Sequence, residues 1–192
     1  MIYSAVTLHW RLADMMKILE NPALIISTLA LLFTVFSFWW MHWRTGKLKI
    51  GTPRSFAAVG SEKGMLLLEI PLVFFNTGPT PILIQNLRLV LCGDSLPPLT
   101  FVATVSKLGK DEGRALATQF PICGRESIVM ICEFQRHPGG LLFKARKYPV
   151  ELQAKLSDEA KWKVLSRFTI NVTEKAIPAI NRMFIPHDNL LE

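Results

Sequence analysis

The pattern of apolar and polar positions changes once along the chain, near residue 44. Residues 22–43 form a run without Asp, Glu, Lys or Arg, in which His42 is the single ionisable side chain. Beyond residue 50, apolar segments of strand length alternate with polar turns that contain Gly and Pro. The pattern therefore predicts a long apolar helix followed by a β-sheet domain, which makes the fold class mainly β.

The apolar run has the length of a membrane span. As a helix from residue 23 to residue 43 it would extend about 31 Å, which matches a hydrocarbon core about 30 Å thick. Helices of globular proteins average about 11–12 residues, so a buried core helix fits the run less well. Asn21 can cap the helix, and Pro22 suits its first turn. We predict a transmembrane helix over residues 21–43.

The end of the run carries amphipathic aromatic residues, which favour the headgroup region of a bilayer. The predicted interfacial anchor consists of Trp39, Trp40 and Trp43. A cleaved signal peptide is the alternative interpretation, but its apolar core would be about 7–15 residues long and would end at small residues. The sequence WWMHWR offers no such site, and we expect a retained anchor in the lipid bilayer.

One side of the predicted helix consists mostly of small or hydroxyl-bearing residues at alternating intervals of four and three residues. This association seam consists of Ala23, Ser27, Ala30, Thr34, Ser37 and Met41. Small side chains let helices approach closely in lipid, and Ser or Thr can add interhelical hydrogen bonds. The seam predicts a homo-oligomer or association with another membrane subunit, although small residues can also share a face by chance.

Charges next to the span set its expected orientation. Residues 1–20 contain two basic and two acidic residues, whereas the stretch after the span is basic and contains no acid: Arg44, Lys47, Lys49 and Arg54. The positive-inside rule then predicts a bacterial inner-membrane protein with its C-terminal domain in the cytoplasm. In this orientation the basic juxtamembrane group would contact anionic headgroups.

The rest of the chain divides by pattern into four further segments. Residues 1–20 place apolar side chains at helical intervals and predict an amphipathic segment, with a loosely ordered tail as the alternative. Residues 44–63 form a basic neck with the first short strands. A β-sandwich domain follows at 64–172, and residues 173–192 form a C-terminal tail that docks on another surface.

About seven short strands between residues 50 and 172 predict an antiparallel β-sandwich. The clearest pair is a hairpin near the end, in which apolar residues alternate with polar ones: Val150, Leu152, Ala154, Leu156, Trp162, Val164, Phe168, Ile170 and Val172. Segment 64–75 is apolar on both faces, as expected of a central strand or of one that faces a partner. The strand spacing and the NTGPTPILI corner resemble an immunoglobulin-like or fibronectin-like architecture over roughly 110 residues.

Composition and motifs do not indicate catalysis. The three cysteines, Cys92, Cys123 and Cys132, form no metal-binding or disulfide pattern, although a bridge between the last two would fit an extracytoplasmic domain. None of the four histidines stands at a metal-ligand spacing, and no nucleophile motif is present. We therefore expect no enzyme activity, no catalytic or metal site and no cofactor.

The net charge of +7 lies entirely after the span. It favours an anionic membrane surface over nucleic acid, because no recognition motif accompanies it. The predicted function is a membrane-anchored, non-enzymatic adaptor, sensor or accessory subunit whose β-sandwich binds a protein partner. The alternative is a ligand-gated oligomeric effector that alters membrane permeability when an anionic signal binds. An anchored hydrolase with a non-sequential site also stays open.

Overall fold

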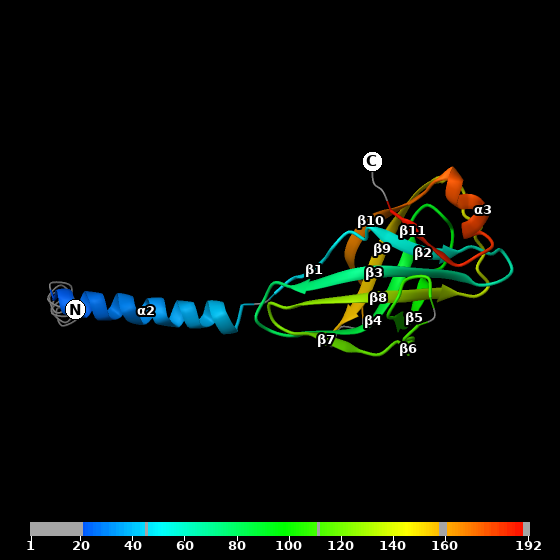
Figure 1. Ribbon diagram of the computed structural model, residues 1–192. Helices are drawn as coiled ribbons and strands as arrows, with labels where there is room; N and C mark the ends of the chain where they lie inside the picture. The colour runs from blue at the N-terminus through cyan, green and yellow to red at the C-terminus, as the bar shows by residue number, and fades with distance from the viewer. Residues whose placement is uncertain (1–20, 45, 111, 158–160, 190–192) are drawn as a thin grey trace, which may run out of the picture. The chain divides into compact units, whose positions relative to one another are not determined.

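The computed structural model describes residues 21–44, 46–110, 112–157 and 161–189. The chain separates into two compact units, which divide after Arg44. The first contains helix α2, and the second contains the β-sheet domain (Figure 1). The amphipathic segment predicted for residues 1–20 lies outside the described residues.

Helix α2 spans Pro22–His42 and confirms the predicted apolar helix. The Asn21 side chain accepts a hydrogen bond from Ala23 N at 3.1 Å, and proline at the first position has no N–H that needs a partner. At the other end, Trp43 N donates to Trp39 O at 2.9 Å. The two capping residues account for the one-residue difference from the predicted range at each end.

Among the described residues, the second unit contains eleven strands in one curled antiparallel sheet. They are β1 (Leu48–Ile50), β2 (Ser55–Val59), β3 (Leu66–Asn76), β4 (Ile82–Leu91), β5 (Leu99–Val105), β6 (Ala115–Leu116), β7 (Phe120–Ile122), β8 (Ser127–Arg136), β9 (Arg146–Leu156), β10 (Lys163–Val172) and β11 (Ile185–Asp188). Two short helices, η1 (Glu174–Ala176) and α3 (Ile177–Ile180), lie between the last two strands.

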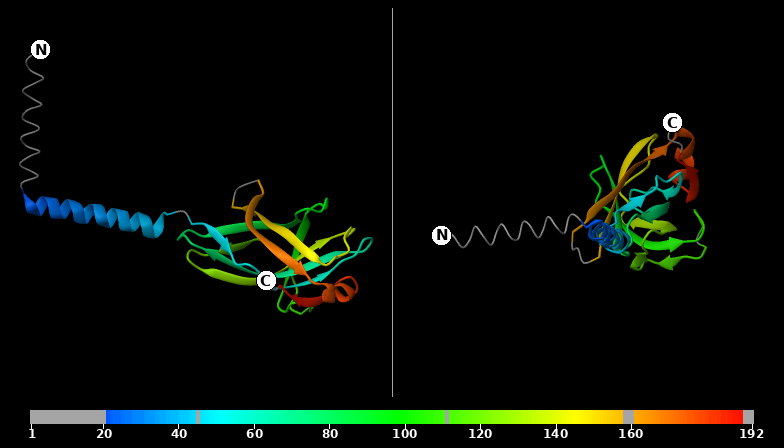
Figure 2. Two further views of the ribbon diagram at one scale, coloured as in Figure 1. Left: turned by 90° about the horizontal axis from the view of Figure 1, so that it is seen from above. Right: turned by 90° about the vertical axis from the view of Figure 1, so that its left-hand side faces the viewer.

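The strands follow the order β10-β9-β4-β5-β8-β3-β2-β11, while β1, β6 and β7 pair with β3, β5 and β4. The sheet curls so that β10, β9 and β4 form one layer and β5, β8, β3 and β2 the other (Figures 1 and 2). The predicted helix-then-sandwich layout is thus confirmed. The immunoglobulin-like assignment stays a prediction: the neighbours within each layer agree with it, but β4 also pairs with β5 and joins the layers.

Alternate residues of the long strands fill the space between the layers. In β3 these are Leu66, Leu68, Ile70, Leu72 and Phe74, all fully buried. The predicted hairpin is present as β9 and β10, and most of its alternating apolar residues face the core. The prediction is wrong for Val164, which is 44% exposed, because a register shift between Val164 and Ser166 packs Leu165 against the core instead. Segment 64–75 is not covered on both faces over its whole length, because Val73 and Phe75 on the outer face are each 41% exposed. The alternative, in which this face meets a partner, stays a prediction.

The sheet extends beyond both predicted borders of the domain. Strands β1 and β2 lie along β3, so most of the neck belongs to the sheet. Strand β11 pairs with β2, so the segment predicted as a tail supplies an edge strand of its own domain. The pattern missed this strand because four residues that include Pro186 show no periodicity.

Asn189 links the two ends of the strand order. Its Nδ2 donates to Pro53 O at 3.0 Å and to Thr169 O at 2.9 Å, while its Oδ1 accepts from Asn171 N at 2.8 Å. Its backbone N donates to Arg54 O at 2.8 Å. One buried residue thereby connects β10, the β1–β2 loop and the end of β11.

Candidate functional site

The surface of α2 is apolar and uncovered. Within the described ranges it is the one helix that is long and apolar enough to cross a membrane, judged by length and composition. None of its residues is buried, and Phe33 is 73% exposed. A core helix of a soluble protein would be mostly buried, whereas membrane anchors and leader sequences have this character. The helix therefore indicates a membrane-associated protein.

The helix brings the six seam residues to one side, because their spacing follows the helical period. Two of their hydroxyls are already used inside the helix: Ser27 Oγ donates to Leu24 O at 3.0 Å, and Thr34 Oγ1 donates to Ala30 O at 2.8 Å. Their oxygens can still accept a hydrogen bond from a neighbouring helix. The seam can therefore contribute small side chains for close packing and hydroxyl oxygens as acceptors, but these two hydroxyl groups already donate within their own helix. The sequence alone did not show this use of the hydroxyl groups.

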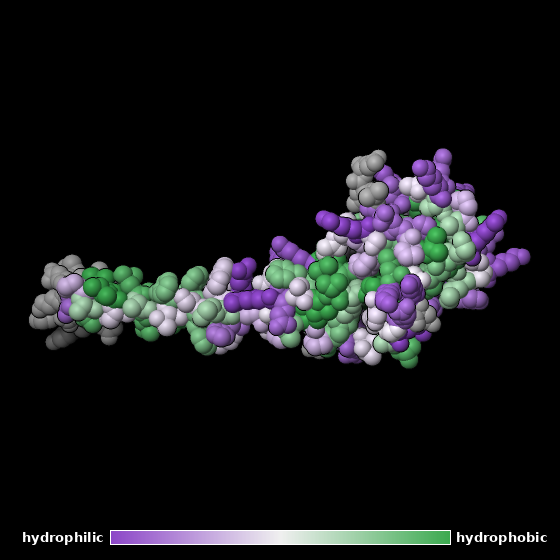
Figure 3. Space-filling model, in the orientation of Figure 1, coloured by the Kyte–Doolittle hydropathy of each residue, from purple (hydrophilic) through white to green (hydrophobic). Residues whose placement is uncertain are grey.

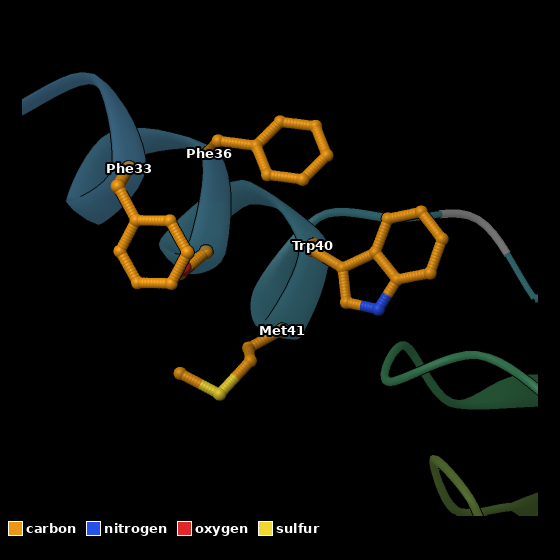
Figure 4. A pocket seen from close by; sticks show the side chains of 5 residues that line it. Phe33, Phe36, Trp40 and Met41 are labelled. Atoms are coloured by element: carbon orange, nitrogen blue, oxygen red, sulfur yellow. The ribbon is translucent and has the colours of Figure 1, made fainter. Parts of the chain in front are cut away.

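A hollow of about 350 Å³ lies beside the C-terminal half of the seam. Its lining residues are Phe33, Phe36, Ser37, Trp40 and Met41, and Figure 4 shows the larger side chains projecting from the helix around it. Ser37 and Met41 belong to the seam, and the aromatic residues flank it. A concave apolar surface whose lining includes the small residue Ser37 suits a side chain from another helix.

The three tryptophans of the predicted anchor belong to two groups of packed rings at the end of α2. The ring centroids of Trp39 and Trp40 lie 6.4 Å apart, and each lies 6.1 Å from Phe36. Trp43 packs edge-on against Phe38 at 5.7 Å. Amphipathic rings gathered at one end of an apolar helix are typical of the membrane interface.

The four cations of the basic juxtamembrane group are divided between the two units of the chain. Arg44 belongs to the helical unit, where its Cζ lies 4.2 Å from the ring centroid of Trp40. Lys47 is tied to Thr77, whose N and Oγ1 both donate to Lys47 O. Lys49 lies in β1, opposite Phe75. Arg54 lies in the β1–β2 loop, and its carbonyl is held by Asn189 as described above.

The sequence analysis missed a buried carboxylate pair on the outer face of the domain. Glu69 in β3 and Glu133 in β8 stand directly opposite each other and are 2% and 3% exposed. Arg114 binds Glu133 through two hydrogen bonds of 2.9 and 3.1 Å. Gly109 N donates to Glu69 Oε2 at 2.7 Å. These contacts pin the β5–β6 loop onto the sheet, and the signal for them was a charged residue inside an apolar strand.

The three cysteine thiols are free and differ in exposure. Cys123 is exposed, Cys92 is half-buried and Cys132 is buried. Burial raises the pKa of the Cys132 thiol, which keeps it protonated and unreactive. In the described part of the chain, no three His, Cys, Asp or Glu side chains come together as a metal site would require. Because Cys123 is the exposed thiol, it is the cysteine that a thiol-labelling reagent should reach.

No protein-family model matches the chain, and no curated protein sequence matches it. Among solved structures it is similar to a candidate lipoprotein of Bacillus subtilis subsp. subtilis str. 168, with 15% sequence identity over 73% of this chain and a TM-score of 0.41. The chain spans 41% of the length of that protein's structure. A likeness of this size carries no conclusion about function.

Proposed function

We propose that the chain is a single-pass membrane protein whose β-sheet domain acts as a non-enzymatic adaptor or accessory subunit of a membrane complex. The observation that carries the proposal is the uncovered surface of α2, a 21-residue helix without a charged side chain and without a buried residue. In water this surface would be unfavourable, at about 25 cal/mol per Å² of apolar area. Lipid or another membrane helix relieves that cost.

Association within the membrane is proposed to occur through the seam. The small side chain of Ala30 and the hollow beside Ser37 support helix packing there. Two substitutions that fill the seam, Ala30→Leu and Thr34→Leu, should weaken association by about 1–2 kcal/mol. The matched control is Ile25→Leu with Val35→Leu, which alters volume little on other faces of the helix.

The experiment measures energy transfer between labelled full-length chains reconstituted in vesicles, across a series of protein-to-lipid ratios. Seam variants should shift the dissociation curve to higher protein density, and the control should follow the unsubstituted chain. Equal curves for the seam variants and the control would remove the association proposal while leaving the anchor intact.

The domain is proposed to face the cytoplasm of a bacterial cell, beside anionic headgroups, because basic residues follow the span. Cys123 makes this testable, since it is exposed whereas Cys132 is buried. An impermeant maleimide should label the chain only after the inner membrane is opened, and Cys123→Ser should remove most of that signal. Labelling of Cys123 in cells with an intact inner membrane would reverse the orientation.

The permeability alternative stays a prediction. Dye release from vesicles that contain the full chain, measured on addition of nucleotides, would test it directly.

A further inference from the structure

Strand β8 has an open edge over part of its length. It pairs with β3 from Ser127 to Arg136, but its pairing with β5 ends at the Val105–Ile131 pair. Residues 127–130 therefore have a neighbouring strand on one side only, as far as the described residues extend. A strand edge of this kind can accept another strand.

The alternation of an antiparallel ladder shows which backbone groups face the open side. Asn76 N donates to Glu126 O at 3.0 Å, and hydrogen-bonded pairs recur at every second residue. Even-numbered residues of β8 therefore exchange hydrogen bonds with β3. Odd-numbered residues face β5, and the N–H and C=O groups of Ser127 and Val129 point to the side where β5 has already ended.

A hollow of about 500 Å³ lies along this edge. One side is formed by the end of β5 and the following loop, and the other by β8: Thr104, Val105, Ser106, Gly113, Val129, Met130 and Ile131. Val129 is 69% exposed, and it stands opposite Val73 in β3. Figures 1 and 3 together show hydrophobic atoms over β3 and β8 on this face.

The outer face of the other layer has a different character. There Arg167 Nε donates to Glu151 Oε1 at 2.8 Å, and Arg88 Nε donates to Gln153 Oε1 at 2.8 Å. Arg88 also stacks on Trp162, with 4.3 Å between its Cζ and the ring centroid. On the outer face of the β10-β9-β4 layer the polar side chains bind one another. The β8 edge instead combines backbone groups that lack a strand partner with an apolar surface.

We propose that the edge of β8 binds an extended apolar segment of a partner protein as an added strand. Strand addition uses backbone donors and acceptors along an apolar groove, whereas lipid headgroups would not match alternating donors and acceptors. A second copy of the chain is disfavoured, because four residues of edge pairing bury far less than the about 1,200 Å² typical of a stable dimer. The partner residue opposite Val129 shares its face and is apolar.

This inference rests on the adaptor function proposed above and adds the surface and the class of partner. It does not require the span to associate, because the edge belongs to the domain alone. Failure of the seam experiment and failure of this one therefore lead to different conclusions.

Proline substitutions test the open edge itself. Val129→Pro removes an N–H that has no strand partner, so the full chain in detergent micelles should unfold at nearly the unsubstituted denaturant concentration. Met130→Pro removes an N–H that β3 binds and should lower the midpoint strongly. In the unsubstituted chain, the Val129 amide should exchange with solvent much faster than the Met130 amide. Equal destabilisation by the two prolines, or equal amide protection, would overturn the inference.

A peptide probe tests binding. The probe is a capped hexapeptide of alternating valine and threonine, and the readout is amide exchange in the full chain. The probe should slow exchange at Val129 and leave Cys92 and its surroundings unchanged. Val129→Pro, or methylation of a peptide nitrogen that faces the edge, should weaken binding at least about tenfold, the factor that corresponds to about 1.4 kcal/mol.

The remaining outcomes count against the proposal. Protection of Val129 that rises with protein concentration without peptide would assign the edge to a second copy. Protection on adding anionic vesicles but not peptide would assign it to lipid. Absence of any protection at peptide concentrations near 1 mM, the affinity range of weak contacts, would leave the edge without a strand partner and overturn the inference.

Discussion

Helix α2 and strand β3 are both strongly apolar, but they cover their apolar surface in opposite ways. No residue of α2 is buried, whereas β3 buries alternate side chains in the core of the domain. The difference follows from backbone hydrogen bonding. A helix satisfies its N–H and C=O groups internally and can enter lipid, whereas a strand needs neighbours on both edges. Apolar composition alone therefore does not decide where a segment resides.

The largest expected effect comes from opening a cavity in the core. Phe134 is fully buried and packs on Phe101, with ring centroids 5.9 Å apart. Phe134→Ala should lower the free energy of unfolding of the domain by about 3–5 kcal/mol. The measurement is denaturant-dependent hydrogen exchange of the full chain in micelles. The control is Phe33→Ala in α2, which should leave domain unfolding unchanged; equal losses would contradict the separation of the two units.

A charged residue placed in α2 tests whether the uncovered apolar surface of the helix lies in lipid. Leu31→Arg places a cation near the middle of the apolar run and should disfavour membrane insertion by about 2.5–3.5 kcal/mol. The measurement is the fraction of chain that resists alkaline extraction from membranes. Val73→Arg, on the exposed face of β3, serves as control and should remain anchored. Unchanged retention of the Leu31 variant would show that α2 does not span the bilayer.

Sequence reasoning recovered the elements with strong periodicity. The apolar run at residues 22–43 and the alternation in the β9–β10 hairpin each determine a local structure, because the pattern repeats over many residues. The β11 strand and the contacts of Asn189 depend on segments far apart in the chain, which no local pattern encodes. In the candidate site, the seam positions followed from spacing, but the hydrogen bonds of Ser27 and Thr34 to their own helix did not.

The carboxylate pair provides a third, intermediate test. Arg114→Leu leaves Glu133 buried without its bidentate partner and should destabilise the domain by about 1–3 kcal/mol. The control is Lys107→Leu, which removes an exposed ion pair with Glu112 and should cost about 0.2–1 kcal/mol. Domain unfolding is followed by hydrogen exchange in the β5–β6 loop. A loss no greater than that of the control would show that the loop is held by other contacts.

The smallest expected effect concerns pH and the edge strand β11. Burial lowers the pKa of His187, whose ring lies 5.5 Å from Phe56 between centroids, and its Nε2 has no hydrogen-bond partner among the described residues. The neutral imidazole is therefore favoured in the folded state. Its contribution to stability is complete above the unfolded pKa of about 6.5 and is lost as pH falls through the lowered folded pKa.

Replacing this imidazole should remove that pH dependence. His187→Phe should unfold at nearly the same denaturant concentration on both sides of the titration, whereas the unsubstituted domain should weaken as pH falls below about 6.5. His137→Phe is the matched control, because His137 is exposed in a turn and should leave the dependence in place. The effect is small because His187 is only partly desolvated. It nevertheless separates the two units, since acidification should loosen β11 without altering how α2 is retained in the membrane.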